Sequence, residues 1–252
     1  MEDTARYVIN SVKLTSCPPV GDLEIRFSSS VTLISGSAGV GKSSLVAALA
    51  CKKWPYGGAV EIDDRGDRHA FENLIPICII DERNALETAP PSAHGHWVSL
   101  AEKHPEILEI AAHRLNQLMR TRLDHYNVPD FGDQTFRITV RRGQRPLVIP
   151  GEQLRTSSRI TSSFFASSGE RTIIHLAGVL AAREYLAIKC PLILDAPFDS
   201  LDENFLPEVV SFIAQLEDQV LVLSHPGHLE MWIERSSRDF EYVVMNRPET
   251  RE

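Results

Sequence analysis

The chain has few cysteines and no long hydrophobic run, and both shortages exclude classes of protein. Four cysteines are spread over 252 residues without a C-x-x-C pair, at positions 17, 51, 78 and 190. This usage excludes a disulfide-stapled secreted scaffold and predicts reduced, buried thiols with no zinc site. The apolar stretches are too short to span a membrane, and Met1-Glu2-Asp3-Thr4 lacks the basic segment of a signal peptide. We therefore expect a cytoplasmic protein with no part in the membrane.

A surplus of basic residues is also missing, since the formal net charge is −8. An acidic total argues against a surface that coats nucleic acid throughout, but it permits a local basic patch. Seven arginines lie between residues 137 and 171, where only Glu152 and Glu170 oppose them. This basic segment fits a lobe that contacts DNA phosphates without reading bases. It fits equally well a solvated hairpin whose arginines pair with acidic groups elsewhere.

One motif is complete. Residues 36–43 match G-x-x-x-x-G-K-[ST] at every fixed position, between an apolar, β-branched run and a helix-forming run. Strand, glycine-rich loop and helix are the context in which this motif binds phosphate. Lys42 is expected to reach the β- and γ-phosphates, and the Ser43 hydroxyl to ligate Mg²⁺. The predicted nucleotide-binding residues are Gly36, Ser37, Ala38, Gly39, Val40, Gly41, Lys42, Ser43 and Ser44.

Strand-like and helix-like segments alternate along the chain. The strands are expected at residues 7–9, 23–27, 31–34, 59–62, 75–80, 135–140, 191–194 and 220–223. Helices are expected at residues 44–50, from near Pro105 to Met119 or Leu123, from Gly169 to about Lys189, and between the last two strands. Alternation around a P-loop predicts an α/β P-loop NTPase with a mixed, mainly parallel sheet.

A second set of motifs follows in the C-terminal half. Leu192-Ile193-Leu194-Asp195 is an apolar strand that ends in a carboxylate, as a Mg²⁺-holding Walker B strand does. Ile77 to Glu82 fits the same weak pattern. Three further features favour Asp195: a Ser-Ser-Gly-Glu-Arg run opens a helix before it, Asp199-Ser200-Leu201-Asp202 follows it, and Leu223-Ser224-His225 ends a later strand.

This order of motifs resembles that of the ATP-binding-cassette (ABC) ATPases. The resemblance covers most of the chain and implies an ABC-ATPase head with a mainly parallel sheet, an antiparallel β part and a helical lobe. It also implies a homodimer that closes around two Mg·ATP. Asp195 would then order Mg²⁺, His225 would contact the γ-phosphate and Asp202 would link the two sites. Ser167, Ser168, Gly169 and Glu170 would cap the nucleotide of the partner subunit.

The Ser-Ser-Gly-Glu-Arg form resembles the SMC, RecF, RecN, OLD and DndD group of ATPases, which act in DNA repair, maintenance and antiviral defence. These proteins usually carry a long coiled coil, whereas residues 94–128 offer one helix without sustained heptads. Either the chain is a compact member or a coiled coil was lost or removed. We expect residues 1–252 to form a single ABC-type domain in which residues 94–128 are a helical insertion.

Ala196 is the main departure from the cassette pattern, because a catalytic Glu commonly follows the Walker B Asp there. Hydrolysis could be slow, so that ATP acts as a clamp. Asp199 could replace the missing carboxylate, or Ala196 could be an introduced substitution that traps ATP. Loss of a general base commonly costs about 10²–10⁴ in rate. Glu82 lies where cassette proteins place a Mg²⁺-sensing residue, although an ion pair with Arg83 is an equal alternative.

The leading hypothesis is an ATP-gated clamp or motor subunit that handles DNA with partner proteins. One alternative is the nucleotide-binding subunit of an ABC transporter. Another is a regulatory ATP-sensing module that controls a toxin or nuclease effector.

Overall fold

The computed structural model describes residues 6–50, 54, 56–81, 95–118, 125–127, 137–142, 145–150, 168–196, 198, 201, 206–227, 229–235 and 240–246. The chain divides into two compact units, which are described separately. Unit 1 comprises Met1–Ile79, Lys189–Ala196 and Ile213–Glu252. Unit 2 comprises Ile80–Ile188 and Pro197–Phe212. No helix in the described ranges has the length and apolar character needed to cross a bilayer.

Four strands of unit 1 belong to a five-stranded sheet with the order β11-β3-β10-β9-β5, in which the edge strand β5 begins at the last residue of the first segment of unit 1 and ends in unit 2. The strands are β11 (Phe240–Met245), β3 (Val31–Gly36), β10 (Val220–Ser224), β9 (Leu192–Asp195) and β5 (Ile79–Asp81). β3 runs parallel to β10 and β11, and β10 runs parallel to β9. Every residue of β3, β9 and β10 is buried. Continuous burial is typical of parallel strands that are covered on both faces.

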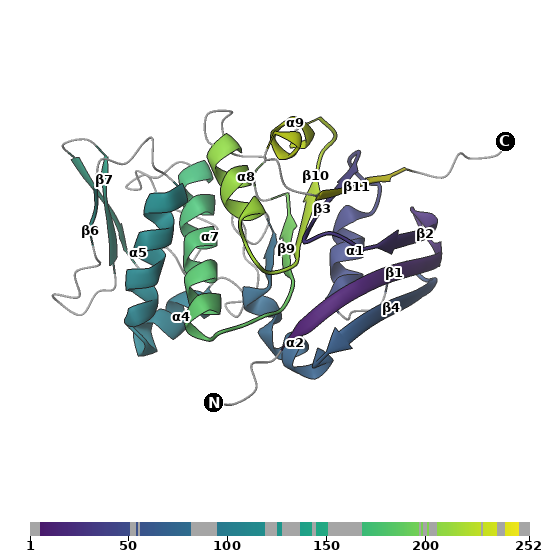
Figure 1. Ribbon diagram of the computed structural model, residues 1–252, viewed down its shortest axis with the longest axis horizontal. Helices are drawn as coiled ribbons and strands as arrows, with labels where there is room; N and C mark the ends of the chain where they lie inside the picture. Colours follow the sequence, from purple (N-terminus) through teal and green to yellow (C-terminus); the bar gives the residue numbers. More distant parts are fainter. Residues whose placement is uncertain are drawn as a thin grey trace. The chain divides into compact units, whose positions relative to one another are not determined.

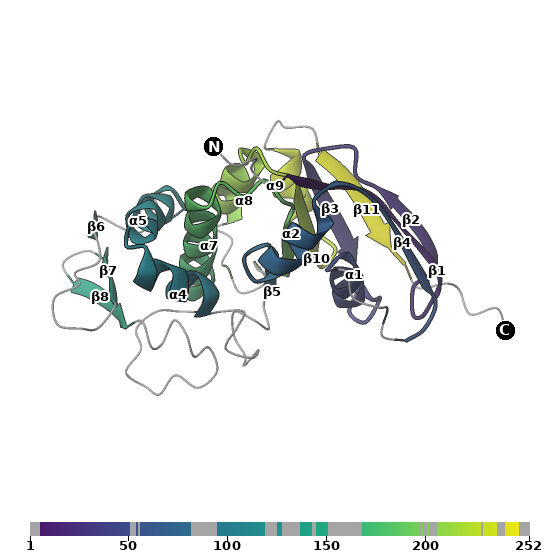
Figure 2. The same ribbon diagram turned by 90° about the horizontal axis from the view of Figure 1, so that it is seen from below.

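A second sheet of unit 1 is antiparallel and has the order β2-β1-β4. It contains β1 (Tyr7–Cys17), β2 (Gly21–Arg26) and β4 (Ala59–Gly66). Helix α1 (Lys42–Leu49) lies between the two sheets (Figures 1 and 2). Five of its eight residues are buried, as expected for a helix that is covered on both sides. Unit 1 also contains α2 (Arg68–Leu74), the 3₁₀ helix η1 (Ile75–Ile77) and α9 (Glu230–Glu234).

Unit 2 is built around helix α7 (Ser168–Tyr185), which packs against α4 (Gly95–Lys103) and α5 (Glu106–Leu118) (Figure 1). Residues 172–183 of α7 are all buried, so this helix is covered around its whole circumference. Gly178 allows the close approach of α4, because a Cβ there would lie 2.5 Å from ring atoms of Trp97. The Trp97 indole N–H also donates to His175 Nδ1 at 3.3 Å.

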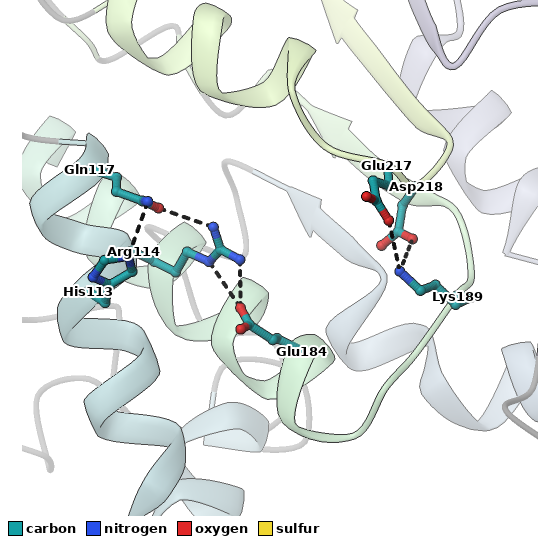
Figure 3. Close-up of polar contacts among 7 residues, drawn as sticks. All are labelled: His113, Arg114, Gln117, Glu184, Lys189, Glu217 and Asp218. Atoms are coloured by element: carbon teal, nitrogen blue, oxygen red, sulfur yellow. Dashed lines mark hydrogen bonds and ion pairs between the residues drawn. The ribbon is translucent and has the colours of Figure 1, made fainter. Parts of the chain in front are cut away.

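Polar contacts join α5 to α7 at the surface of unit 2 (Figure 3). Two N–H groups of Arg114 donate to one carboxylate oxygen of Glu184, at 2.7 and 3.1 Å. The Arg114 side chain also contacts Gln117. Because both members of the ion pair are partly exposed, it contributes at most about 1 kcal/mol, so apolar packing dominates this interface.

The described part of unit 2 also contains a small sheet and a further helix. The sheet has the order β6-β7-β8 and is antiparallel. Its strands are β6 (His125–Asn127), β7 (Arg137–Arg142) and β8 (Arg145–Pro150). Four of the seven arginines of the basic segment fall in β7 and β8, at positions 137, 141, 142 and 145. Helix α8 (Leu206–Ala214) begins in unit 2, and its last two residues belong to unit 1.

The expected α/β architecture with a mainly parallel sheet and an antiparallel part is confirmed. The expectation of one helix in residues 94–128 is wrong, because α4 and α5 are separate and β6 follows them. Pro105 disfavours the helical conformation at His104, so α4 ends at Lys103. The strand expected at residues 75–80 is only partly present. Pro76 has no N–H to give to a ladder, and the chain forms η1 before β5 begins at Ile79.

Candidate nucleotide-binding site

The complete motif forms a strand-loop-helix unit in unit 1. β3 ends at Gly36, residues 37–39 are exposed, and α1 begins at Lys42. Gly39 and Gly41 have φ values of 73° and 103°, which lie in the left-handed region that favours glycine. A Cβ on Gly41 would also lie 2.8 Å from Val20 Cγ2. The glycines therefore permit both the turn and its packing against the segment between β1 and β2.

The first turn of α1 has no side-chain cap. Its N-cap is Gly41, which has no side chain to cap the helix, and no acidic residue occupies the first turn. The backbone N–H groups at such a helix start are suited to binding an anion. The Ser43 side chain, one residue into the helix, is exposed, and Ser44 is half-buried.

Lys42 brings a positive charge to the loop. The residue is only 8% exposed. The ammonium donates to the carbonyl oxygen of Gly36 and, at 3.1 Å, to that of Ser37. These bonds fold the lysine back over the start of the loop. A phosphate bound by the loop would therefore meet a cation that is already held in position.

The strand register brings Asp195 and His225 to the same edge of the sheet as the loop. Ile34 of β3 pairs with Leu223 of β10, and Leu223 pairs with Asp195 of β9. Since neighbouring strands lie about 4.8 Å apart, the Cα atoms of Ile34 and Asp195 are separated by roughly 10 Å. Asp195 is 6% exposed, whereas His225, the residue after β10, is exposed. Ligands of open α/β sheets bind at this carboxyl edge.

Ala196, the position of the missing carboxylate, has an unusual backbone conformation. Its φ value of 49° lies in the left-handed region, which few non-glycine residues occupy. Its N–H donates to the Leu223 carbonyl at 2.9 Å, so the conformation is held by the neighbouring strand β10. The residue is half-buried. A longer side chain at position 196 would therefore start from the carboxyl edge, directly after Asp195.

The segment with the Ser-Ser-Gly-Glu-Arg run belongs to unit 2. The helix that it was expected to open is α7, which begins at Ser168, so Gly169 and Glu170 lie in its first turn. Four predicted site residues lie outside the described residues: Glu82, Ser167, Asp199 and Asp202. Their roles stay predictions.

Three residues that no motif predicted join the nucleotide-site edge of unit 1. Ser35, next to Gly36, and Tyr242 of β11 both donate hydroxyl hydrogen bonds to Glu230 Oε1, at 3.1 and 2.9 Å. Burial acts to raise the pKa of Glu230. The backbone N–H groups of Gly227 and Glu230 and the two hydroxyls outweigh it and hold the pKa below its ordinary value. Because these residues are far apart in sequence, no local pattern could have found them.

Solved structures share this fold over nearly the whole chain. The SMC head domain from Thermotoga maritima is 13% identical, covers 95% of both chains and has a TM-score of 0.52. The SMC head from Pyrococcus furiosus with an extended coiled coil, bound to the C-terminal domain of ScpA, is 13% identical with a TM-score of 0.60. It covers 96% of this chain and 94% of its own. The chain has the ABC-ATPase head fold.

A dimeric bacterial ABC transporter cassette also has this head fold. It is 14% identical, covers 96% of both chains and has a TM-score of 0.53. No protein-family model matches the chain, and no curated protein does. The expected resemblance to ABC and SMC heads is thus confirmed for the fold.

Proposed function

We propose that the chain is an ABC-type ATPase head that binds Mg·ATP at the carboxyl edge of the five-stranded sheet in unit 1. The observation that carries the proposal is the convergence of three separate segments at that edge: the loop at residues 36–43, Asp195 and His225. In other α/β folds that bind nucleotides, phosphates and their metal occupy this position.

The residues present fit a metal-bound triphosphate. The exposed loop and the uncapped start of α1 suit the phosphates, while Lys42 supplies a fixed positive charge. The exposed Ser43 hydroxyl and the Asp195 carboxylate are oxygen donors of the kind that Mg²⁺ takes, directly or through water. Bound Mg²⁺ would neutralise phosphate charge and orient the terminal phosphate. His225 is proposed to contact the γ-phosphate, which makes it the residue that distinguishes ATP from ADP.

We further propose that two copies close around two ATP molecules. A dimeric cassette is among the solved structures that share the fold, and the resemblance assigns capping of the partner's nucleotide to Ser167 and Gly169. In this arrangement each copy holds half of each site. The loop of unit 1 would bind the phosphates, and the start of α7 in the other copy would complete the enclosure.

A role in DNA repair, maintenance or antiviral defence is the preferred biological setting. The likeness to SMC heads supports it, as does the basic segment, of which four arginines lie in β7 and β8. DNA would be held through its phosphates, so binding would weaken steeply with salt. The likeness to a transporter cassette supports the nucleotide-binding subunit of a transporter as the second candidate.

Gel filtration with light scattering tests the proposal. We expect the wild-type chain to shift from monomer to dimer in ATP and Mg²⁺. Lys42→Ala should lose the shift because it loses the nucleotide, and Ser167→Arg should lose the shift while it still binds ATP. A Ser167→Arg chain that dimerises normally would overturn the sandwich arrangement. Retention on DNA at low salt, and not with a membrane fraction, would favour the DNA role over transport.

A further inference from the structure

Glu230 joins the histidine segment to the strand that leads into the phosphate loop. The histidine segment comprises the described residues 225–227 and 229, and the residues that flank it on both sides contact Ser35. At one end, Ser224 of β10 pairs in register with Ser35 of β3. At the other end, Glu230 accepts the Ser35 hydroxyl hydrogen bond at 3.1 Å. Because Ser35 directly precedes Gly36, the segment that carries His225 is fastened beside the first glycine of the loop.

Two further groups hold the same carboxylate. Tyr242 of β11, which is the other neighbour of β3, donates to Glu230 Oε1 at 2.9 Å. The backbone N–H of Gly227, two residues after His225, also stabilises the charged carboxylate and helps to lower the pKa of Glu230. One charged side chain therefore connects β3, β11 and the interior of the histidine segment. Hydrogen bonds to a charged acceptor are stronger than neutral ones.

We propose that Glu230 is a positioning residue: it holds the histidine segment against β3 so that His225 can contact the terminal phosphate of ATP. This inference rests on the proposed ATP-binding function. Glu230 does not touch the nucleotide in this role and acts through His225. Its effect is therefore confined to the contact that ATP makes and ADP does not.

The expected effect on nucleotide affinity follows from the contacts that Glu230 makes. Without Glu230, the segment loses its hydrogen bonds to Ser35 of β3 and Tyr242 of β11, and the exposed His225 is held less closely beside the loop. The γ-phosphate contact then weakens, while the contacts of Lys42 and the loop with the β-phosphate remain. We expect Glu230→Ala to reduce the preference for ATP over ADP by about tenfold, which corresponds to the loss of roughly one hydrogen bond.

The test measures dissociation constants of fluorescent ATP and ADP analogues with Mg²⁺, using the full chain. Glu230→Ala should weaken ATP about tenfold and leave ADP within about twofold of wild type. Glu230→Gln, which keeps an oxygen acceptor but no charge, should fall between the two. Glu234→Ala is the matched control, because Glu234 is an exposed glutamate on the same helix. It should bind both analogues as wild type does.

A double-mutant cycle with His225→Ala separates positioning from a general structural role. If Glu230 acts through His225, Glu230→Ala should change ATP affinity by less than about twofold in a His225→Ala background. Independent effects that multiply would overturn the proposal, as would equal losses of ATP and ADP affinity. If Glu230→Ala fails to fold, the same cycle with Tyr242→Phe decides, with the same expectation. A wild-type chain that binds neither analogue would instead refute the proposed ATP-binding function.

Discussion

Replacement of Ala196 by glutamate asks whether a missing carboxylate limits ATP turnover. A general base contributes about 10²–10⁴ in rate, or about 2.7–5.4 kcal/mol of the activation barrier. In the cassette pattern the carboxylate occupies the position after Asp195. If the chain binds ATP as proposed and lacks only this group, Ala196→Glu should raise the rate of phosphate release by at least about a hundredfold.

The backbone conformation at Ala196 allows this substitution without added strain. The left-handed φ of 49° costs a residue with a Cβ about 1–2 kcal/mol, but alanine already bears that cost. Glutamate and glutamine add no new strain of this kind, and the half-buried site gives a longer side chain access to solvent. The free energy of unfolding of both variants should therefore stay within about 0.5 kcal/mol of the wild-type value. The free energy of unfolding of Ala196→Gly should rise by up to about 1 kcal/mol. Glycine removes the strain of the left-handed conformation and offsets only part of this gain through the greater entropy of the unfolded chain.

The assay is phosphate release at saturating ATP and Mg²⁺, with the free energy of unfolding measured in urea for each variant. Ala196→Gln is the control, since it matches glutamate in size but cannot accept a proton. The reasoning is refuted if Ala196→Glu folds, binds ATP as wild type does and still hydrolyses it no faster than Ala196→Gln. In that case another group, such as Asp199, or another step limits turnover.

Three further predictions test the site and the packing that supports it. Lys42→Ala should weaken ATP binding by at least about tenfold in a fluorescence titration, because a charge-assisted contact is worth about 1.5–3 kcal/mol; unchanged affinity would exclude the loop as the phosphate site. Gly178→Ala should destabilise the chain by about 1–3 kcal/mol in urea, because the new Cβ would lie 2.5 Å from the Trp97 ring. An unchanged free energy of unfolding for Gly178→Ala would contradict the packing of α4 against α7. Glu230→Gln should lower the melting temperature at neutral pH. Because folding lowers the pKa of Glu230, its charge stabilises the fold at pH values above the ordinary pKa of 4.5. This contribution is lost as the pH falls through the lowered pKa. The two melting curves should thus converge in acid, and a constant difference would contradict the role of the charge.

The parts of the site that are contiguous in sequence can be predicted from it. The loop at residues 36–43 is specified by glycines where the backbone has positive φ and by a lysine at the helix start. β9 and β10 are predictable because each is a short, continuously apolar run that ends in a polar residue, Asp195 or Ser224. Such runs are typical of buried parallel strands in a chain that has helices between its strands. Because β9 and β10 are parallel, their carboxyl ends must lie at the same edge of the sheet.

Contacts between distant segments cannot be predicted in this way. Glu230 and Ser35 are 195 residues apart, and neither belongs to a motif. Helix α4 cannot be predicted from the sequence because it is short, and because a glycine and a nearby pair of prolines favour a loop. Its buried face is Trp97, Val98 and Ala101, which only the presence of α7 makes apparent. Tertiary packing decides both cases, and local propensity carries no signal.

Sequence identities of 13–14% with TM-scores of 0.52–0.60 indicate which properties maintain this fold. Few side chains are shared, so specific core residues cannot be what defines it. In this chain the shared fold has three adjacent strands that are buried along their whole length, a tight turn between the first of them and a helix, and polar groups where the other two end. Side chains of equal volume can be exchanged within those strands at small cost. The turn and the polar ends have less freedom, because φ values of 73° and 103° favour glycine, and the proposed binding of phosphate and Mg²⁺ needs a cation and oxygen donors. The motifs of this chain can therefore be recognised at a sequence identity at which its core residues no longer reveal the fold.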